Sequence, residues 1–256
     1  MIDDRAVVAS SAKLAANVSV GPFAIIGENV EIGEGTWIGP HTIVKGPTRI
    51  GRDNKIFQFS SIGEDPQDKK YCGESTWLEI GDRNVIREFC TVNRGTAQDS
   101  GVTRIGDDNW IMAYVHIAHD CIVGDHTVFA NNASLAGHVQ INSYAILGGY
   151  TLVYQFCRVG SYSLCAFASG IHRDVPPYFI ADGYRAEPRG INIEGLRRNG
   201  FTPDEINAIR RAYKLLYTSD LKLDEAIARI RTLAKQQSRL NLLLDFISSG
   251  KRSIIR

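Results

Sequence analysis

Four of the six histidines in this chain crowd into one stretch, from Ile111 to His138. His119 is followed directly by Asp120, and His116 and His138 lie close by in the sequence. A neutral imidazole can act as a general base near neutral pH, and an adjacent carboxylate can orient it. A single exposed histidine is often merely solvated, but this cluster predicts a site of general-base chemistry.

The residues around these histidines repeat with a period of six. Apolar residues stand at every sixth position: Ile111, Ile117, Val123, Phe129 and Leu135. A sustained period of six is typical of a parallel β-helix, in which three six-residue sides complete one coil of a prism. The repeated apolar residue and a small fifth residue point into the prism, so we expect the histidines to face outward.

The same repeat accounts for most of the chain, with two interruptions. It starts at Ile2 and ends near Asp174, where Pro176 and Pro177 cannot donate ladder hydrogen bonds. Polar segments near residues 64–76 and 93–104 interrupt it, and we expect external loops there, since loops outside a scaffold often carry function. The predicted fold is mainly β, with a left-handed parallel β-helix over residues 1–178.

Residues 179–256 are expected to form a C-terminal α-helical domain. Thr202-Pro203-Asp204-Glu205 is a capping box with proline at the first helical position, and an apolar stripe follows it. Two further helices are predicted over residues 224–235 and 240–247.

Composition narrows the function classes. The net charge of +1 gives no basic field that would favour nucleic-acid binding. Five cysteines without a CxxC pair, three of them (Cys90, Cys121 and Cys157) at the small fifth position, indicate reduced core residues and a cytoplasmic protein. The repeat begins at Ile2, so we expect no signal peptide, and no apolar run approaches a membrane span.

The prism converts sequence separation into position. Residues 18 apart occupy the same place on successive coils, roughly 4.8 Å apart along the axis. His119, Gly137, Gln155 and Arg173 form one such outward column. The Gly137 N–H would then lie within reach of an oxyanion that develops beside His119.

Several segments resemble the UDP-N-acetylglucosamine O-acyltransferase family: HIAHDCIVG, NNASLAGHV, GGYTLVYQFC, DVPPY, NIEGLRRNGF and QDKKYCGE. The resemblance covers essentially the whole chain. It implies a homotrimer, with active sites between neighbouring prisms, that moves a 3-hydroxyacyl group from acyl carrier protein to the 3-hydroxyl of UDP-N-acetylglucosamine. It also implies no metal or organic cofactor, because the thioester is already activated.

The resemblance also implies roles for individual residues. His119 matches the general base, Asp120 its orienting carboxylate and Gly137 the backbone donor to the oxyanion. The matches to substrate-binding residues are Asp68, Lys70, His116, His138 and Gln155 near the sugar, and Asn192, Glu194 and Arg198 at the nucleotide end. Two positions depart from the family pattern, where Tyr154 replaces a frequent histidine and Asn199 a frequent arginine.

Two further expectations concern the acyl donor. Phe167 matches the position that closes the acyl groove, which predicts a chain on the order of ten carbons rather than fourteen; the alternative is that it packs in the trimer interface. Basic residues of the tail could steer the acidic carrier protein, or could simply be solvated: Arg197, Arg210, Arg211 and Lys214.

Two other function classes remain open from the residues. Three clustered histidines could bind zinc, as in the γ-class carbonic anhydrases that share this prism. The chain could also be a non-catalytic β-helical scaffold. Within the acyltransferase class, a different hexapeptide-repeat acyltransferase is the alternative. A metal assay and a measurement of nucleotide-sugar binding would separate these possibilities.

Overall fold

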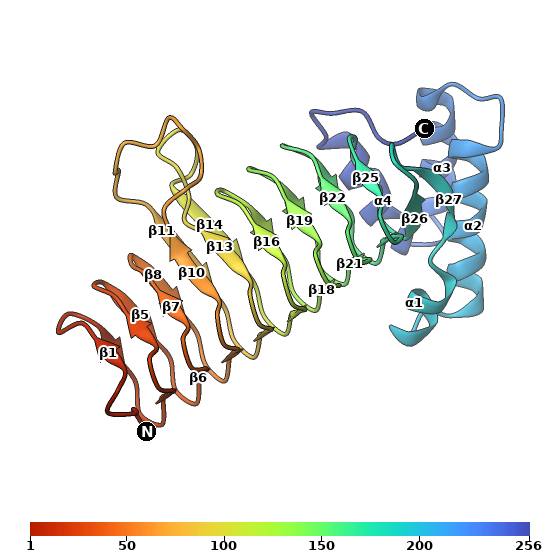
Figure 1. Ribbon diagram of the computed structural model, residues 1–256. Coiled ribbons are helices and arrows are strands. Elements are labelled where there is room, and N and C mark those ends of the chain that lie inside the picture. The colour runs from red at the N-terminus through yellow and green to blue at the C-terminus, as the bar shows by residue number, and fades with distance from the viewer.

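The computed structural model describes residues 1–256 and confirms the left-handed parallel β-helix followed by helices (Figure 1). Each coil contributes one short strand to each of three sheets, which contain nine, eight and ten strands. Figure 1 shows the coils stacked in sequence order from β1 near the N-terminus to β25 beside the helices. The corners between sheets therefore form straight columns along the prism.

The strands fall into three groups, named here the first, second and third sheets. The first comprises β1 (Val7–Val8), β4 (Ile25–Ile26), β7 (Ile43–Val44), β10 (Ser61–Glu64), β13 (Thr91–Asn93), β16 (His116–Ile117), β19 (Ser134–Leu135), β22 (Leu152–Val153) and β25 (Gly170–Ile171). The second comprises β2 (Lys13–Leu14), β5 (Val30–Ile32), β8 (Thr48–Ile50), β11 (Trp77–Ile80), β14 (Val102–Ile105), β17 (Ile122–Val123), β20 (Gln140–Ile141) and β23 (Arg158–Val159). The third comprises β3 (Ser19–Val20), β6 (Trp37–Ile38), β9 (Lys55–Ile56), β12 (Val85–Ile86), β15 (Trp110–Ile111), β18 (Val128–Phe129), β21 (Ile146–Leu147), β24 (Leu164–Cys165), β26 (Phe179–Asp182) and β27 (Glu187–Ile191).

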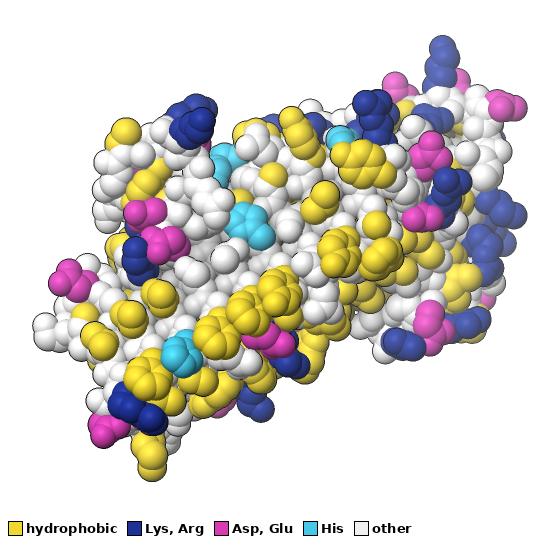
Figure 2. All heavy atoms as spheres, in the orientation of Figure 1, with side chains coloured by type: hydrophobic (Ala, Val, Ile, Leu, Met, Phe, Trp, Pro, Cys, Tyr) yellow, Lys and Arg dark blue, Asp and Glu magenta, His cyan; other side chains and the backbone are white.

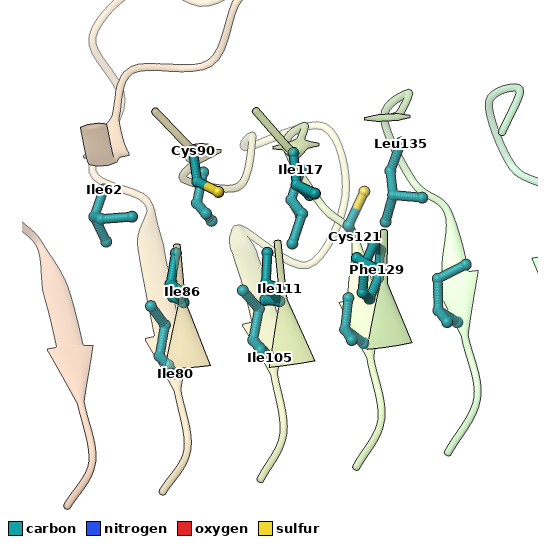
Figure 3. Close-up of a cluster of buried hydrophobic side chains, with 14 of the residues drawn as sticks. Ile62, Ile80, Ile86, Cys90, Ile105, Ile111, Ile117, Cys121, Phe129 and Leu135 are labelled. Carbon is teal, nitrogen blue, oxygen red and sulfur yellow. The ribbon is translucent and has the colours of Figure 1, made fainter. Parts of the chain in front are cut away.

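The repeated apolar residues form one continuous core inside the prism. Figure 3 shows Ile86, Ile111 and Phe129 of the third sheet pointing inward, with Cys90 and Cys121 filling corners of the same core. Each fully buried aliphatic side chain contributes about 1.5–3 kcal/mol relative to an exposed one. Four of the five cysteines are buried free thiols, as predicted for core residues, but Cys72 is exposed in the first interrupting loop.

Both predicted interruptions are loops, although the second is shorter than expected. The first loop covers residues 65–76 between β10 and β11, and the second covers residues 94–101 between β13 and β14. Val102 to Arg104, which we expected to lie in the loop, belong to β14 because they pair in parallel with Trp77 to Glu79 of β11. Each loop therefore ends at a four-residue strand, and the two strands, β11 and β14, pair with each other.

The sheet structure continues past the boundary expected at residue 178. Pro176 and Pro177 lie in the turn before β26, outside the ladder, so they do not prevent β26 from pairing in parallel with β24. β27 then returns antiparallel to β26. Ala181 faces the prism core and Phe179 the helical core, so β26 joins the two domains.

The tail contains the three predicted helices and one short additional helix: α1 (Ile193–Arg198), α2 (Pro203–Tyr217), α3 (Leu223–Ala234) and α4 (Arg239–Ser248). The predicted capping box is present, because Thr202 and Glu205 each bond to the other's backbone N–H. After α4 the chain returns to the prism, where Ile254 pairs with Asp174 and Ile255 joins the prism core. None of the helices combines the length and apolar character that a membrane span requires.

Candidate active site

His119 and Asp120 lie at the corner between β16 of the first sheet and β17 of the second. His119 Nδ1 lies 2.8 Å from Asp120 Oδ2, close enough for its N–H to donate to the carboxylate. Asp120 has a φ of 59°, a left-handed conformation that turns the chain at the corner and aims its side chain along the column. With Nδ1 bonded to the carboxylate, the neutral ring keeps a free lone pair on Nε2, as a general base requires.

The Asp120 carboxylate is held in its ionised form. Burial alone would raise the pKa of this carboxyl group, but hydrogen bonds from His119 and Thr96 outweigh it and hold the pKa below its usual value. The Thr96 N–H donates to Oδ1 at 2.9 Å, and the Thr96 hydroxyl donates to Oδ2 at 2.7 Å. The Asp120 N–H in turn donates to the Thr103 hydroxyl at 2.8 Å.

His119 points away from the prism core as predicted, but it is not open to solvent. The 94–101 loop folds back over the corner, and His119 is only 7% exposed. Thr96 is a site residue that the sequence analysis missed. The only feature of the sequence that could have indicated a role for Thr96 is its place in a loop outside the repeat.

Gly137 contacts the His119 ring directly, as the predicted column requires. Ile117 pairs with Leu135, and Leu135 pairs with Val153. The residues two positions later, His119, Gly137 and Gln155, therefore stack in register on successive coils. A Cβ atom on Gly137 would lie 2.5 Å from His119 Cε1, closer than any real contact. The Gly137 N–H donates no hydrogen bond within the chain, which leaves it free for an oxyanion.

The two other histidines of the cluster flank this pair. The His138 ring meets the His119 ring edge to face, with centroids 5.0 Å apart, and His138 Nδ1 lies 2.7 Å from Asp99 Oδ2. His116 Nδ1 lies 2.7 Å from the Thr91 hydroxyl oxygen. Burial, and to a smaller extent the nearby His119, lowers the pKa of His116, which favours its neutral form.

A cavity of about 700 Å³ is lined by His138, the one clustered histidine that it reaches, and by residues of both inserted loops. Asp68 and Lys70 of the first loop line this cavity, together with Asp99 of the second loop and His138. Arg94, at the foot of the second loop, ties the loops together by hydrogen bonds to the Gly63 carbonyl, the Asp65 carboxylate and the Tyr71 hydroxyl. The cavity therefore has the position expected for a substrate pocket next to His119.

The remaining candidate residues lie apart from this cavity within one chain. Gln155 is exposed on the column of His119, whereas Phe167 lies at a different corner, between β24 of the third sheet and β25 of the first. Asn192 caps α1 and donates to the carbonyl of Tyr162, a residue at the corner between the second and third sheets. Glu194 and Arg198 form an exposed ion pair on that helix at 3.1 Å.

The two departures from the family pattern are both exposed. Tyr154 stacks on His172, with ring centroids 6.0 Å apart. Asn199 follows α1 and donates to the Gly195 carbonyl at 2.8 Å, so its amide ends the helix.

The residues that could hold a metal ion differ from the three histidines weighed above. His119, Asp120 and His138 offer ligand atoms within 4.8 Å of one another, and His116 is not in this group. Asp120 already accepts hydrogen bonds from His119 and twice from Thr96. The carboxylate thus has the environment of an orienting group for His119.

Comparisons with known proteins place the chain in a family. The family sequence model described as Udp N-acetylglucosamine O-acyltransferase, Domain 2, matches residues 174–255, and that of the bacterial transferase hexapeptide matches residues 103–137. The acyl-[acyl-carrier-protein]–UDP-N-acetylglucosamine O-acyltransferase of Thiobacillus denitrificans is 55% identical over 255 residues, which cover 100% of this chain and 99% of the relative. A relative of the same description from Herminiimonas arsenicoxydans is 52% identical, with coverage of 100% and 99%.

Solved structures are similar over the whole length. The UDP-N-acetylglucosamine acyltransferase of Francisella novicida is 45% identical, with a TM-score of 0.98 and coverage of 100% of this chain and 94% of that one. The UDP-N-acetylglucosamine O-acyltransferase of Moraxella catarrhalis is 47% identical, with a TM-score of 0.97 and coverage of 100% and 99%. Full-length identity at this level, with helical tail and prism both matched, shows that the chain belongs to the UDP-N-acetylglucosamine O-acyltransferase family.

Proposed function

We propose that this protein transfers a 3-hydroxyacyl chain from acyl carrier protein to the 3-hydroxyl of UDP-N-acetylglucosamine, the first step of lipid A synthesis, with His119 as general base. The observation that carries the proposal is the contact of His119 with both Asp120 and Gly137. It joins a base, an orienting carboxylate and a free N–H donor in a chain of this family.

The geometry supports a direct acyl transfer. His119 Nε2 takes the proton of the sugar hydroxyl as its oxygen attacks the thioester carbonyl carbon, and the Gly137 N–H stabilises the oxyanion. The C–S bond then breaks, and the imidazolium returns the proton to the departing thiolate. A positioned base typically contributes 10²–10⁴ in rate, and an oxyanion donor roughly 10²–10³. No metal or organic cofactor enters these steps.

In the proposal, two groups of residues bind the two ends of the nucleotide sugar. Asp68, Lys70, His116, His138 and Gln155 border the His119 corner and would bind the sugar and phosphates. Asn192, Glu194 and Arg198 lie near another corner of the same chain, so in the proposal they hold the nucleotide at the site of a neighbouring subunit.

The surface supports a homotrimer with sites between subunits. Figure 2 shows hydrophobic side chains gathered in a band along one edge of the prism. Exposed apolar residues recur at the corner between the third and first sheets and on the first sheet itself: Phe23, Phe59, Phe89, Tyr114, Tyr150, Val7, Ile25, Ile43 and Leu152. The outer second sheet instead carries a ladder of alternating charge from Lys13 through Glu31, Arg49 and Glu79 to Arg104. Apolar surface of this extent marks an interface, and His116 lies on the same first sheet.

The acyl donor would arrive bound to its acidic carrier protein. Arg210, Arg211 and Lys214 are exposed on α2, and Arg211 and Lys214 border a groove with Arg229 of α3. A basic face of this kind favours rapid encounter with an acidic partner. The five unpaired cysteines support the cytoplasm as the compartment.

The test is incubation of the purified protein with UDP-N-acetylglucosamine and a panel of 3-hydroxyacyl carrier proteins, with the acylated nucleotide sugar detected by mass spectrometry. Light scattering on the same sample gives the number of subunits. Absence of product with every donor would contradict the proposed reaction, and a monomer of full activity would contradict the shared site.

A further inference from the structure

Asp99 is the one acidic residue of the 94–101 loop, and the sequence analysis assigned it no role. Its carboxylate is half-exposed, yet it lies on His138, with Oδ2 2.7 Å from Nδ1. The site therefore contains two histidine–carboxylate pairs, His119 with Asp120 and His138 with Asp99.

The ring contacts of His138 fix the plane of the imidazole but do not determine which of its two nitrogens carries the proton. The ring stacks on Phe156, with centroids 4.5 Å apart and planes 13° apart, and meets the His119 ring at 88°. A stacked imidazole that turned by half a revolution, or moved its proton between nitrogens, would keep these contacts. An ionised carboxylate can only accept hydrogen bonds, so Asp99 requires an N–H at Nδ1 and leaves Nε2 of the neutral ring as an acceptor.

We propose that Asp99 is a positioning residue that holds His138 as the Nδ1–H tautomer, so that Nε2 accepts a hydrogen bond from a hydroxyl group of the sugar substrate. The identity of that substrate rests on the function proposed above, but the tautomer does not. His138 lines the cavity beside Asp68 and Lys70, which places its ring on the path of a bound sugar.

The loop delivers Asp99 to this position through its anchor on the catalytic pair. Thr96, three residues earlier, bonds twice to Asp120 and so fixes the loop over the corner. Asp120 Oδ2 is 3.9 Å from His138 Nδ1, beyond hydrogen-bond distance, so Asp99 is the carboxylate that pairs with this nitrogen. Asp99 thus leaves Asp120 to His119.

Asp99→Leu tests the assignment, because a leucine of similar size has no atom that accepts a hydrogen bond from Nδ1, so nothing holds the proton on that nitrogen. In the neutral form of the ring, ¹⁵N spectra of the labelled protein should show an unprotonated Nε2 at His138 in the wild type and a protonated Nε2 in Asp99→Leu. The His138 signals are assigned by their loss in His138→Gln. In turnover assays the variant should raise the KM for UDP-N-acetylglucosamine roughly tenfold, with kcat changed far less.

Two further variants serve as controls. Asp99→Glu restores a carboxylate and should recover the wild-type tautomer and part of the KM. Ser100→Ala changes the adjacent residue of the loop, whose hydroxyl donates only to the Val102 carbonyl, and should match the wild type.

A wild-type His138 with a protonated Nε2, or an unchanged tautomer in Asp99→Leu, would overturn the proposal. So would equal KM values for Asp99→Leu and Ser100→Ala. If the wild type transfers no acyl chain, the proposed reaction fails by that result, while the ¹⁵N spectra still decide the role of Asp99.

Discussion

At the scale of single residues, His119 depends on neighbours from three separate segments. Asp120 is the next residue in the chain, at the same corner before β17. Gly137 lies one coil further on, and Thr96 comes from the loop that covers the corner. None of these neighbours contributes to the prism core. Substitutions here should therefore change catalysis more than stability.

His119→Ala should lower kcat by on the order of 10²–10⁴ without changing the oligomeric state, because a general base is lost from outside the core. Steady-state kinetics and light scattering measure the two effects. Asp120→Ala should cost less, since it removes an orienting group. His126→Ala is the matched control, because His126 lies at another corner, where it stacks on Tyr144. A His119→Ala enzyme with near-normal kcat would contradict the general-base assignment.

Phe167→Gly should shift the preference toward longer acyl donors. Phe167 is 70% exposed at the corner between the third and first sheets, and its ring packs edge to face with that of Tyr150. Each methylene that gains a buried site is worth about 0.8 kcal/mol, so four of them are worth about 3 kcal/mol. The measurement is kcat/KM across donors of increasing length. An unchanged preference together with a weaker trimer would make Phe167 an interface residue and not a ruler.

At the scale of elements, the two inserted loops act as one unit on a rigid scaffold. The prism holds the ends of the loops, where β11 pairs with β14, and Arg94 of the second loop is hydrogen-bonded to β10 and to the first loop. The first loop carries Asp68 and Lys70 to the cavity, and the second carries Thr96 and Asp99 to the histidines. A substrate that enters the cavity contacts both.

Lys70→Ala should mainly raise the KM for UDP-N-acetylglucosamine, roughly tenfold, because a charged hydrogen bond to the sugar or a phosphate is lost. Its side chain is exposed, so the melting temperature should stay constant. Lys69→Ala, one residue earlier and equally exposed, is the matched control. If Lys70→Ala lowers the melting temperature and leaves KM unchanged, the loop is only structural.

At the scale of the whole molecule, the C-terminal segment closes the end of the prism. Arg158 of β23 donates to the Asp174 carboxylate at 2.7 Å, to the Ser249 hydroxyl at 3.0 Å and to the Phe246 carbonyl at 2.7 Å. These bonds join the last coils to α4. They also hold the wall of the cavity that Ser249 and Arg252 form.

Arg158→Met should destabilise the protein by roughly 3–5 kcal/mol, because it leaves the buried Asp174 without its counter-ion. Burial already raises the pKa of Asp174, and loss of the arginine should raise it further. The folded variant then binds a proton more strongly than the unfolded chain, so its stability falls as pH rises from the unfolded carboxyl pKa toward the raised folded one.

Urea unfolding at several pH values measures this effect, and the deficit of Arg158→Met should shrink toward acid pH. Adding Asp174→Asn should remove the pH dependence. A deficit that is the same at every pH would mean that lost packing, and not the buried charge, causes it.

The prism, its core residues and the column that joins His119 to Gly137 could all be predicted from the amino-acid sequence. The period of six allows this, because each apolar residue must face inward and each coil must stack on the last, which converts spacing into position. The capping box at Thr202 was equally local and equally predictable.

The way in which the non-repeating segments contact that column could not be predicted and is visible only in the folded chain. Thr96 reaches Asp120 across 24 residues and Asp99 reaches His138 across 39, and no period links them. The strand β26 after two prolines and the return of Ile255 to the prism core depend likewise on contacts between distant segments. A loop outside the repeat takes its conformation from the polar groups that it happens to cover, and those groups become neighbours only when the chain has folded.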